Sequence, residues 1–356
     1  MGFLQKLVDL VKEELLDEPK QPQKAKKSSN STSPKSEKPK GDSFEQLCAK
    51  AKAGDLGAQF RLADESDKYS AEKLNTVSEL FKEMMDNGDI EGKCIWGFLN
   101  RETPEGKKAM DQAADAGAFF GLLLNGFYFG NPIGFRRGIY DSVKYRNIIP
   151  ADVPNDVIIK MPLDPANALI FLEKAASKLE ERSKEEQSAL HLVYGLLTYV
   201  YFSNTHEDTK IQRYAAKGAE YNDPIALLML GNMSHMGICG YEKNLDYALQ
   251  YYQKAEKHID KLGDDGPLHD TFIPWLYCMI GIVYDRQHKE SSSKKAASYF
   301  EKAAKKGSLY AMFALSRYHE LGVFLPKDPE KILYWRTKAI AGGFDMNRFN
   351  PPAYSI

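Results

Sequence analysis

Apolar residues recur at helical spacing through most of the chain, from Asp42 onward. Inside these predicted helices a small residue returns at a regular place, usually directly after a large apolar one. This first column consists of Ala63, Gly97, Gly126, Gly195, Gly231, Gly281 and Ser316. Gly inside a helix costs about 1 kcal/mol relative to Ala, so aligned small residues need a reason in packing. They predict helices that approach their neighbours closely.

A second column of mostly small residues lies in the helix that follows each of these. It consists of Met84, Ala113, Ala175, Gly218, Ala255, Ala303 and Ala339. In four cases 13 residues separate a second-column residue from the next first-column residue, as from 84 to 97. Four positions after the second column stand Gly88, Gly117, Gly307 and Gly343, where a left-handed residue that ends a helix favours Gly. Each unit therefore reads as helix A, a turn, helix B and a glycine turn.

The C-terminal units carry further shared residues. One reads Ala311-Met-Phe-Ala-Leu315-Ser-Arg-Tyr318, then Leu321-Gly322-Val323, Pro326-Lys-Asp328 and Tyr334-Trp335-Arg-Thr-Lys338-Ala339. Residues 223–257 follow the same pattern, and both units resemble the Sel-one-like repeat, a relative of the tetratricopeptide repeat. The resemblance is looser before about residue 185, and Asn125, Glu65 and Met233 depart from it. It implies an α/α solenoid that mediates protein–protein interaction and brings no catalytic residues.

The pattern predicts an all-α fold, an α/α superhelical solenoid of about seven helix-pair repeats over residues 42–343. One helix pair cannot bury both of its faces, so pairs stack and share a continuous core. A helix over 42–53 precedes the first pair, and Ser43 and Gln46 fit a capping box at its start. Residues 116–135 and 187–206 lack Asp, Glu, Lys and Arg, but their polar and Gly residues favour buried helices over membrane spans.

The N-terminal region differs in composition from the repeats. Residues 1–18 predict a short amphipathic helix, which at about 22 Å is too short to cross a bilayer. Charged residues such as Lys6 and Asp9 interrupt it, so it is not a signal peptide. Residues 19–41 hold seven Lys, five Ser and four Pro, which predicts a disordered linker. The helix has three possible docking places: a partner's groove, which its acidic residues favour, a membrane surface, or the solenoid. Residues 344–356 form a C-terminal tail.

An insertion interrupts the third unit near residues 130–163. There 49 residues separate the first column from the second, against 16 to 24 elsewhere, and a smaller excess follows Ala255. The insertion mixes basic and aromatic residues, which suits contact with phosphate, an acidic partner or RNA. These candidate partner-binding residues are Arg136, Arg137, Tyr140, Lys144, Tyr145 and Arg146. The simpler interpretation is a solvated excursion whose aromatic residues pack on the solenoid.

Composition narrows the possible chemistry. Lys and Arg number 48 against 49 Asp and Glu, and a net charge of −1 argues against specific nucleic-acid binding. Four cysteines without a CxxC pair indicate a reducing compartment, so we expect a cytoplasmic protein. His235 and Cys239 are four apart, but Gly237 and Gly240 break their helix and no further ligand lies nearby. We expect no metal, cofactor or catalytic site.

The sequence therefore predicts a non-enzymatic scaffold or adaptor that binds an unidentified protein partner. One alternative is a peripheral membrane-associated organiser, tethered by weak membrane-surface contact through residues 1–18. A less favoured alternative is an enzyme with a cryptic site near the 130–163 insertion.

Overall fold

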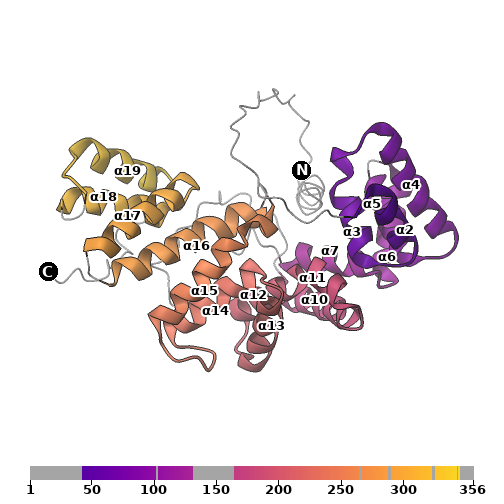
Figure 1. Cartoon of the computed structure of the whole chain (residues 1–356), viewed down its shortest axis with the longest axis horizontal. Helices are drawn as coiled ribbons and strands as arrows, with labels where there is room; N and C mark the ends of the chain where they lie inside the picture. The colour runs from indigo at the N-terminus through magenta and orange to yellow at the C-terminus, as the bar shows by residue number, and fades with distance from the viewer. Residues whose placement is uncertain are drawn as a thin grey trace.

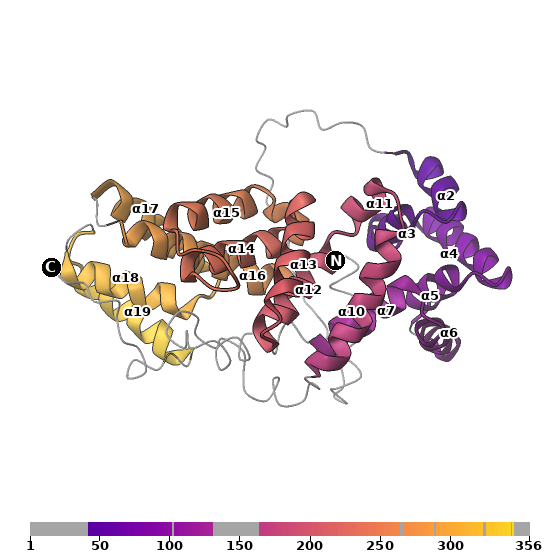
Figure 2. The ribbon, with the colours of Figure 1, turned by 90° about the horizontal axis from the view of Figure 1, so that it is seen from below.

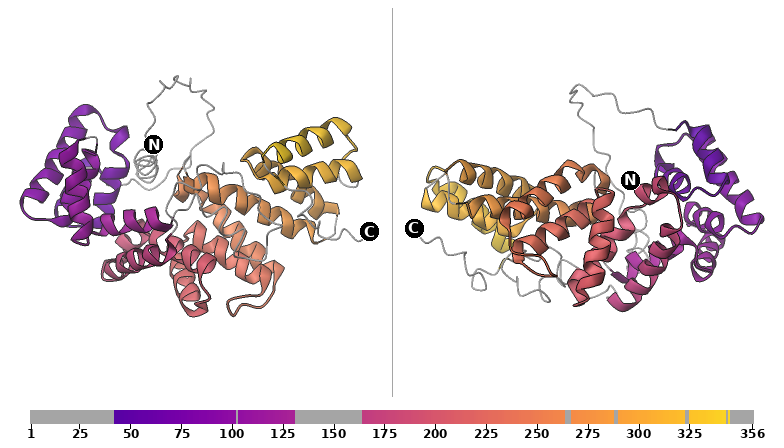
Figure 3. Two further views of the ribbon diagram at one scale, coloured as in Figure 1. Left: turned by 180° about the vertical axis from the view of Figure 1, so that it is seen from behind. Right: turned by 60° about the horizontal axis from the view of Figure 1, so that its bottom comes forward.

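The structure is a computed structural model that describes residues 42–101, 103–130, 164–263, 267–287, 290–322, 325–342 and 344. Within these residues the secondary structure is helical, and they contain no strand. Figure 1 shows the helices as a curved stack that leads from α2 at one end to α19 at the other. Figures 2 and 3 show the same order from other directions. The predicted all-α solenoid is thus confirmed.

Sixteen α-helices and two short 3-10 helices make up the described part of the chain. The α-helices are α2 (Phe44–Lys52), α3 (Leu56–Asp64), α4 (Ala71–Asp86), α5 (Ile90–Leu99), α6 (Pro104–Asp115), α7 (Phe119–Gly130), α10 (Pro165–Glu180), α11 (Lys184–Ala189), α12 (Leu192–Asn204), α13 (Asp208–Glu220), α14 (Pro224–Met236), α15 (Leu245–Lys257), α16 (Pro267–Asp285), α17 (Glu290–Lys305), α18 (Leu309–Leu321) and α19 (Pro329–Ala341). The 3-10 helices are η1 (Ser66–Lys68) and η2 (Ile259–Leu262).

Fourteen of the α-helices form the seven predicted units. The A helices are α3, α5, α7, α12, α14, α16 and α18, and the B helices are α4, α6, α10, α13, α15, α17 and α19. From the second unit on, the A and B helices of each unit pack against each other. In the first unit α3 packs mainly on α2, and α4 packs on α5. The short α11 is an additional helix between the third and fourth units.

The first-column residues lie on the A helices, where most glycines allow close contact with helix B. A Cβ added at Gly281 would lie 2.7 Å from the ring of Phe300 on α17, and one at Gly231 would clash with Tyr252 on α15. Gly195 differs, because a Cβ there would clash with the carboxylate of Asp223 at the start of α14. The predicted reason for small residues, close helix approach, therefore holds.

The second column and the turns also follow the prediction. Every second-column residue is buried. Gly88, Gly117 and Gly307 have φ of +85°, +81° and +96°, the left-handed conformation that ends a helix. Asn222, four positions after Gly218, takes the same role with φ +54°. Gly343 lies outside the described residues.

The two charge-free stretches differ in how much of them is described. In the second, α12 is buried along its length from Leu192 to Ser203, as predicted for a helix surrounded by others. Of the first, α7 carries the part up to Gly130. Among the described helices, none combines the length and the apolar character needed to cross a bilayer. The additional residues that separate Ala255 from the next first-column residue form η2 and part of the 19-residue α16.

Candidate interaction surface

The six candidate partner-binding residues of the insertion, 136, 137, 140, 144, 145 and 146, lie outside the described residues. The same holds for residues 1–41 and 345–356. Among the described residues, we therefore consider the junctions at which one helix-pair unit packs against the next. Three of these junctions carry a tyrosine four positions before the second column, Tyr214, Tyr251 or Tyr299, together with a lysine.

At the junction of units three and four, a carboxylate gathers two hydroxyls and an ammonium. Glu173 on α10 accepts hydrogen bonds from Tyr201 (2.5 Å) and Tyr214 (3.4 Å), and Lys210 Nζ lies 3.1 Å away. Burial acts to raise the pKa of Glu173, but these bonds outweigh it and hold the pKa below its usual value. Burial and the bond to Glu173 raise the pKa of Tyr201. The carboxylate is therefore ionised and the phenol neutral at neutral pH.

The junction of units five and six also joins a carboxylate to a tyrosine and a lysine, although its carboxylate and lysine come from other repeat positions. Glu256 on α15 accepts a hydrogen bond from Tyr299 (2.8 Å) and another from Lys302 Nζ (3.1 Å), both on α17. Lys302 Nζ also lies 4.4 Å from the centroid of the Tyr299 ring, close enough for a cation–π interaction. Burial, followed by the bond to Glu256, raises the pKa of Tyr299. Both junctions are thus held by a carboxylate that one unit supplies to the next.

The junction of units four and five has the same donors and no carboxylate in the matching place. Tyr251 and Lys254 stand four and one positions before Ala255, as Tyr299 and Lys302 stand before Ala303. The position of Glu256, one after the second column, is Ala219 in α13. Lys254 Nζ instead lies 3.5 Å from the carbonyl oxygen of Ala219.

An exposed tyrosine lies beside this junction. Tyr247 is 58% exposed and stands one turn before Tyr251 on the same side of α15. Tyr251 is half-buried and Lys254 is exposed. We call Tyr247, Tyr251 and Lys254 the α15 ridge. Sequence periodicity finds its tyrosine and lysine positions, but only the structure shows that Lys254 lies beside a backbone carbonyl where Lys302 has a carboxylate.

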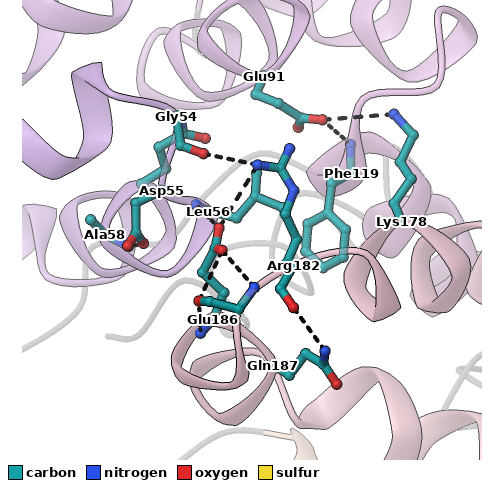
Figure 4. Close-up of polar contacts among 12 residues, drawn as sticks. Gly54, Asp55, Leu56, Ala58, Glu91, Phe119, Lys178, Arg182, Glu186 and Gln187 are labelled. Carbon is teal, nitrogen blue, oxygen red and sulfur yellow. Dashed lines mark hydrogen bonds and ion pairs between the residues drawn. The ribbon is translucent and has the colours of Figure 1, made fainter.

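Long-range polar contacts set the arrangement of the N-terminal units (Figure 4). Glu186 on α11 accepts a hydrogen bond from the N–H of Leu56, the first residue of α3, at 3.0 Å. Arg182 donates to the carbonyl oxygen of Gly54 at 3.3 Å. The contacts join residues about 130 apart in sequence. They bring the first unit to the start of the fourth, beyond the nearest-neighbour contacts that a repeat pattern predicts.

A second glutamate caps a helix in a similar way. Glu91 on α5 accepts a hydrogen bond from the N–H of Phe119 at 2.7 Å, and Lys178 Nζ lies 4.0 Å from the same carboxylate. Burial raises the pKa of Glu91, although both of these partners favour its ionised form. Neither Glu91 nor Glu186 belongs to a repeated column, so the sequence pattern did not reveal them.

Two buried histidines, His191 and His235, lie in polar contacts with neighbouring side chains. His235 Nε2 lies 2.7 Å from Arg286 Nη1, and burial, with Arg286 and Lys243, lowers the pKa of His235 to about 3. His191 Nδ1 lies 2.5 Å from Asp223 Oδ2, while Asp223 Oδ1 accepts the N–H of Ala226 and so caps α14. Across the described ranges, no group of three or more His, Cys, Asp or Glu residues could hold a metal ion.

Comparison with known families finds the Sel1 repeat in four segments, residues 159–178, 224–258, 281–308 and 309–344. No curated protein matches the sequence. A Sel1 repeat protein from Oxalobacter formigenes has a similar crystal structure, with 18% sequence identity and a TM-score of 0.41; the match covers 93% of this chain and 96% of that one.

A second crystal structure belongs to a protective antigen present in uropathogenic Escherichia coli strains, which displays an SLR fold. Its sequence is 19% identical and its TM-score is 0.44. The match covers 83% of this chain and 64% of that protein, so the chain spans less than two thirds of its length.

Proposed function

Because the chain carries Sel1 repeats in an α/α solenoid, we propose that it is a non-enzymatic protein-interaction scaffold or adaptor. Sel1 repeats generally mediate protein–protein binding. Several polar groups of this chain lie in structural contacts, such as Glu186 at the start of α3, His191 beside Asp223 and His235 beside Arg286. The observation that carries the proposal further is the α15 ridge. It presents an exposed tyrosine beside a tyrosine–lysine pair that no carboxylate of α13 meets.

The ridge fits an acidic segment of a protein partner. At the next junction the chain shows how the same pair holds a carboxylate, with Tyr299 and Lys302 both donating to Glu256. A partner's Asp or Glu would receive the corresponding donors from Tyr251 and Lys254. Tyr247 adds aromatic contact area, and tyrosine is among the residues enriched in interface hot spots.

A substitution that supplies the carboxylate from within the chain tests this proposal. Ala219→Glu places an acid where Glu256 stands at the next junction, so it should compete with the partner for Tyr251 and Lys254. Thr209→Glu adds the same charge to an exposed position of α13, about 15 Å along the helix from Ala219, and is the matched control. Each variant carries the photo-crosslinking residue benzoylphenylalanine in place of Tyr247 and is expressed in the source cells.

We expect a protein adduct from position 247 that Thr209→Glu retains and Ala219→Glu loses. A crosslinker at Glu79, which is exposed on α4, should not give the same adduct. Adducts that are identical at both positions, or that persist in Ala219→Glu, would show that the ridge is not the binding surface.

For the segments outside the described residues, we propose roles from the sequence alone. Residues 1–18 act as a docking helix on the 19–41 linker, and the 130–163 insertion supplies a second recognition element through its basic and aromatic residues. Residues 344–356 form a C-terminal tail. Cys48, Cys94 and Cys239 form no disulfide in the described part of the chain, which supports a reducing, cytoplasmic setting.

A further inference from the structure

Two apolar side chains stand exposed on α19, the B helix of the seventh unit. Leu333 is 68% exposed and Ile340 is 52% exposed. They lie seven residues apart and therefore share one face of the helix. Relative to Ala339 of the second column, they stand six positions before and one position after.

In α17, the B helix of the preceding unit, the same two positions are buried beneath the A helix that follows. They are Ala297 and Ala304, each 3% exposed. In α6 the position after the second column is Ala114, and a Cβ added to Gly121 of the next A helix would lie 2.7 Å from its Cβ. Leu333 and Ile340 thus occupy the face on which the next A helix packs.

The opposite end of the stack is closed by polar residues. The outer side of α2 exposes Glu45, Gln46, Lys50 and Lys52. A polar outer face is typical of the helices that cap repeat arrays. Exposed Leu333 and Ile340 are therefore expected to pack against a further segment, whereas the polar outer side of α2 is suited to contact with solvent.

Phe344, which follows α19, is placed like the first residue of an A-helix segment. The N–H of Phe344 donates to the carbonyl oxygen of Ala339 at 2.9 Å. The corresponding hydrogen bond is found before α18, where the N–H of the N-cap residue Ser308 donates to the carbonyl oxygen of Ala303 at 2.9 Å. Phe344 is buried, and its ring stacks on Phe313 of α18 with the centroids 5.0 Å apart. Phe344 thus stands where the A helix of an eighth unit would begin.

We propose that residues 345–356 occupy the place of an eighth A helix and cover Leu333 and Ile340. Met346 and Phe349 supply apolar side chains for this contact. A helix cannot continue through Pro351 and Pro352, so the segment forms half a unit and closes the array.

The place of attachment favours this segment over other occupants. Residues 1–18 are joined through a 23-residue linker to α2, which lies at the other end of the stack (Figure 1). Residues 345–356 are attached next to the face, which gives them a high effective concentration there.

The test follows the reactivity of a cysteine placed on the covered face of the full-length chain. Leu333→Cys reports the face, and Tyr334→Cys is the control, because its counterpart Ser298 in α17 is exposed although a unit follows. Maleimide labelling of each site is measured by mass spectrometry of the labelled peptide. Each reporter is combined with Met346→Asp and Phe349→Asp, which should detach the segment.

We expect the aspartate substitutions to speed labelling at position 333 several-fold and to leave position 334 unchanged. Ser355→Asp, a charge added beyond the predicted contact, should change neither rate. The proposal is overturned if the rate at position 333 does not respond to the aspartates. It is also overturned if that rate rises instead on dilution or on removal of residues 1–41, because a second copy or the N-terminal helix would then be the cover.

Discussion

At the scale of single residues, the first-column glycines decide how closely the two helices of a unit approach. The ring of Tyr252 fills the space that a side chain at Gly231 would need. Its hydroxyl donates to Asn232 Oδ1 at 2.8 Å, so the ring is fixed on both sides and cannot easily move away. The repeat spacing predicts that this position is small, but only the structure identifies the side chain that requires it.

Gly231→Leu should therefore overpack the contact between α14 and α15 and lower the free energy of unfolding by about 1–3 kcal/mol or more. Urea denaturation followed by circular dichroism measures the change. Lys257→Leu adds a leucine at an exposed position of α15 and should have little effect. An unchanged midpoint for Gly231→Leu would mean that the column alignment is wrong.

His235 should make stability depend on pH. Its pKa is about 3 in the folded chain and about 6.5 when unfolded, because burial and then Arg286 disfavour the charged form. Between these values the unfolded state binds a proton that the folded state does not. The contribution is full above pH 6.5 and is lost progressively as the pH falls toward 3.

His235→Gln removes this proton while leaving an acceptor for Arg286. Urea midpoints at pH 7.5 and pH 5 should differ less in the variant than in the unmodified protein. The carboxylates that titrate in acid are the same in both proteins, so the difference isolates His235. Equal pH dependence in the two would contradict the assigned pKa.

At the scale of elements, the sequence predicts the helices well and their long-range contacts poorly. Helix starts and ends depend on local signals, such as the Ser43–Gln46 capping box, in which each backbone N–H bonds the other side chain. Glu186 acts at α3, about 130 residues away, and no local pattern encodes such a pairing. Tyr251 and Lys254 follow the repeat. That Ala219 replaces an acidic residue becomes clear only when this junction is compared with the next one, where Glu256 accepts hydrogen bonds from Tyr299 and Lys302.

Glu186→Ala should destabilise the fold by about 1–2 kcal/mol, because it removes the acceptor for the buried N–H of Leu56 and the capping box of α11. Glu185→Ala removes the same charge from an exposed neighbouring position and should be nearly neutral. Thermal melting of both variants gives the comparison. If the two variants melt alike, the contact between α11 and α3 does not hold the N-terminal units.

At the scale of the whole molecule, the array has irregular places that the repeat does not require. The insertion at 130–163 lies between α7 and α10, which nevertheless pack closely as the two helices of the third unit. Replacing residues 131–163 by a short Gly/Ser turn should keep the helical circular-dichroism signal while weakening partner binding. Loss of the fold in this deletion would show that the segment is structural, and would remove the case for a recognition loop.

The helix predicted for residues 1–18 gives the last prediction. In such a helix an apolar face would be formed by Phe3, Leu4, Leu7, Val8, Val11, Leu15 and Leu16, and a helix of about 15 residues could not bury that face by itself. The 23-residue linker would place it about 25–30 Å from α2 if it behaves as a flexible coil. If the helix is a docking arm, a chain that begins at Asp42 should melt at the same temperature as the full chain.

The same shortened chain should bind its partner more weakly, and comparison of its binding to liposomes of anionic lipid separates a protein groove from a membrane surface. The acidic residues Asp9, Glu13, Glu14, Asp17 and Glu18 oppose anionic lipid, so we expect the loss in partner binding and little change on liposomes. A marked fall in melting temperature would contradict the docking arm, because the helix would then contribute to the stability of the solenoid itself.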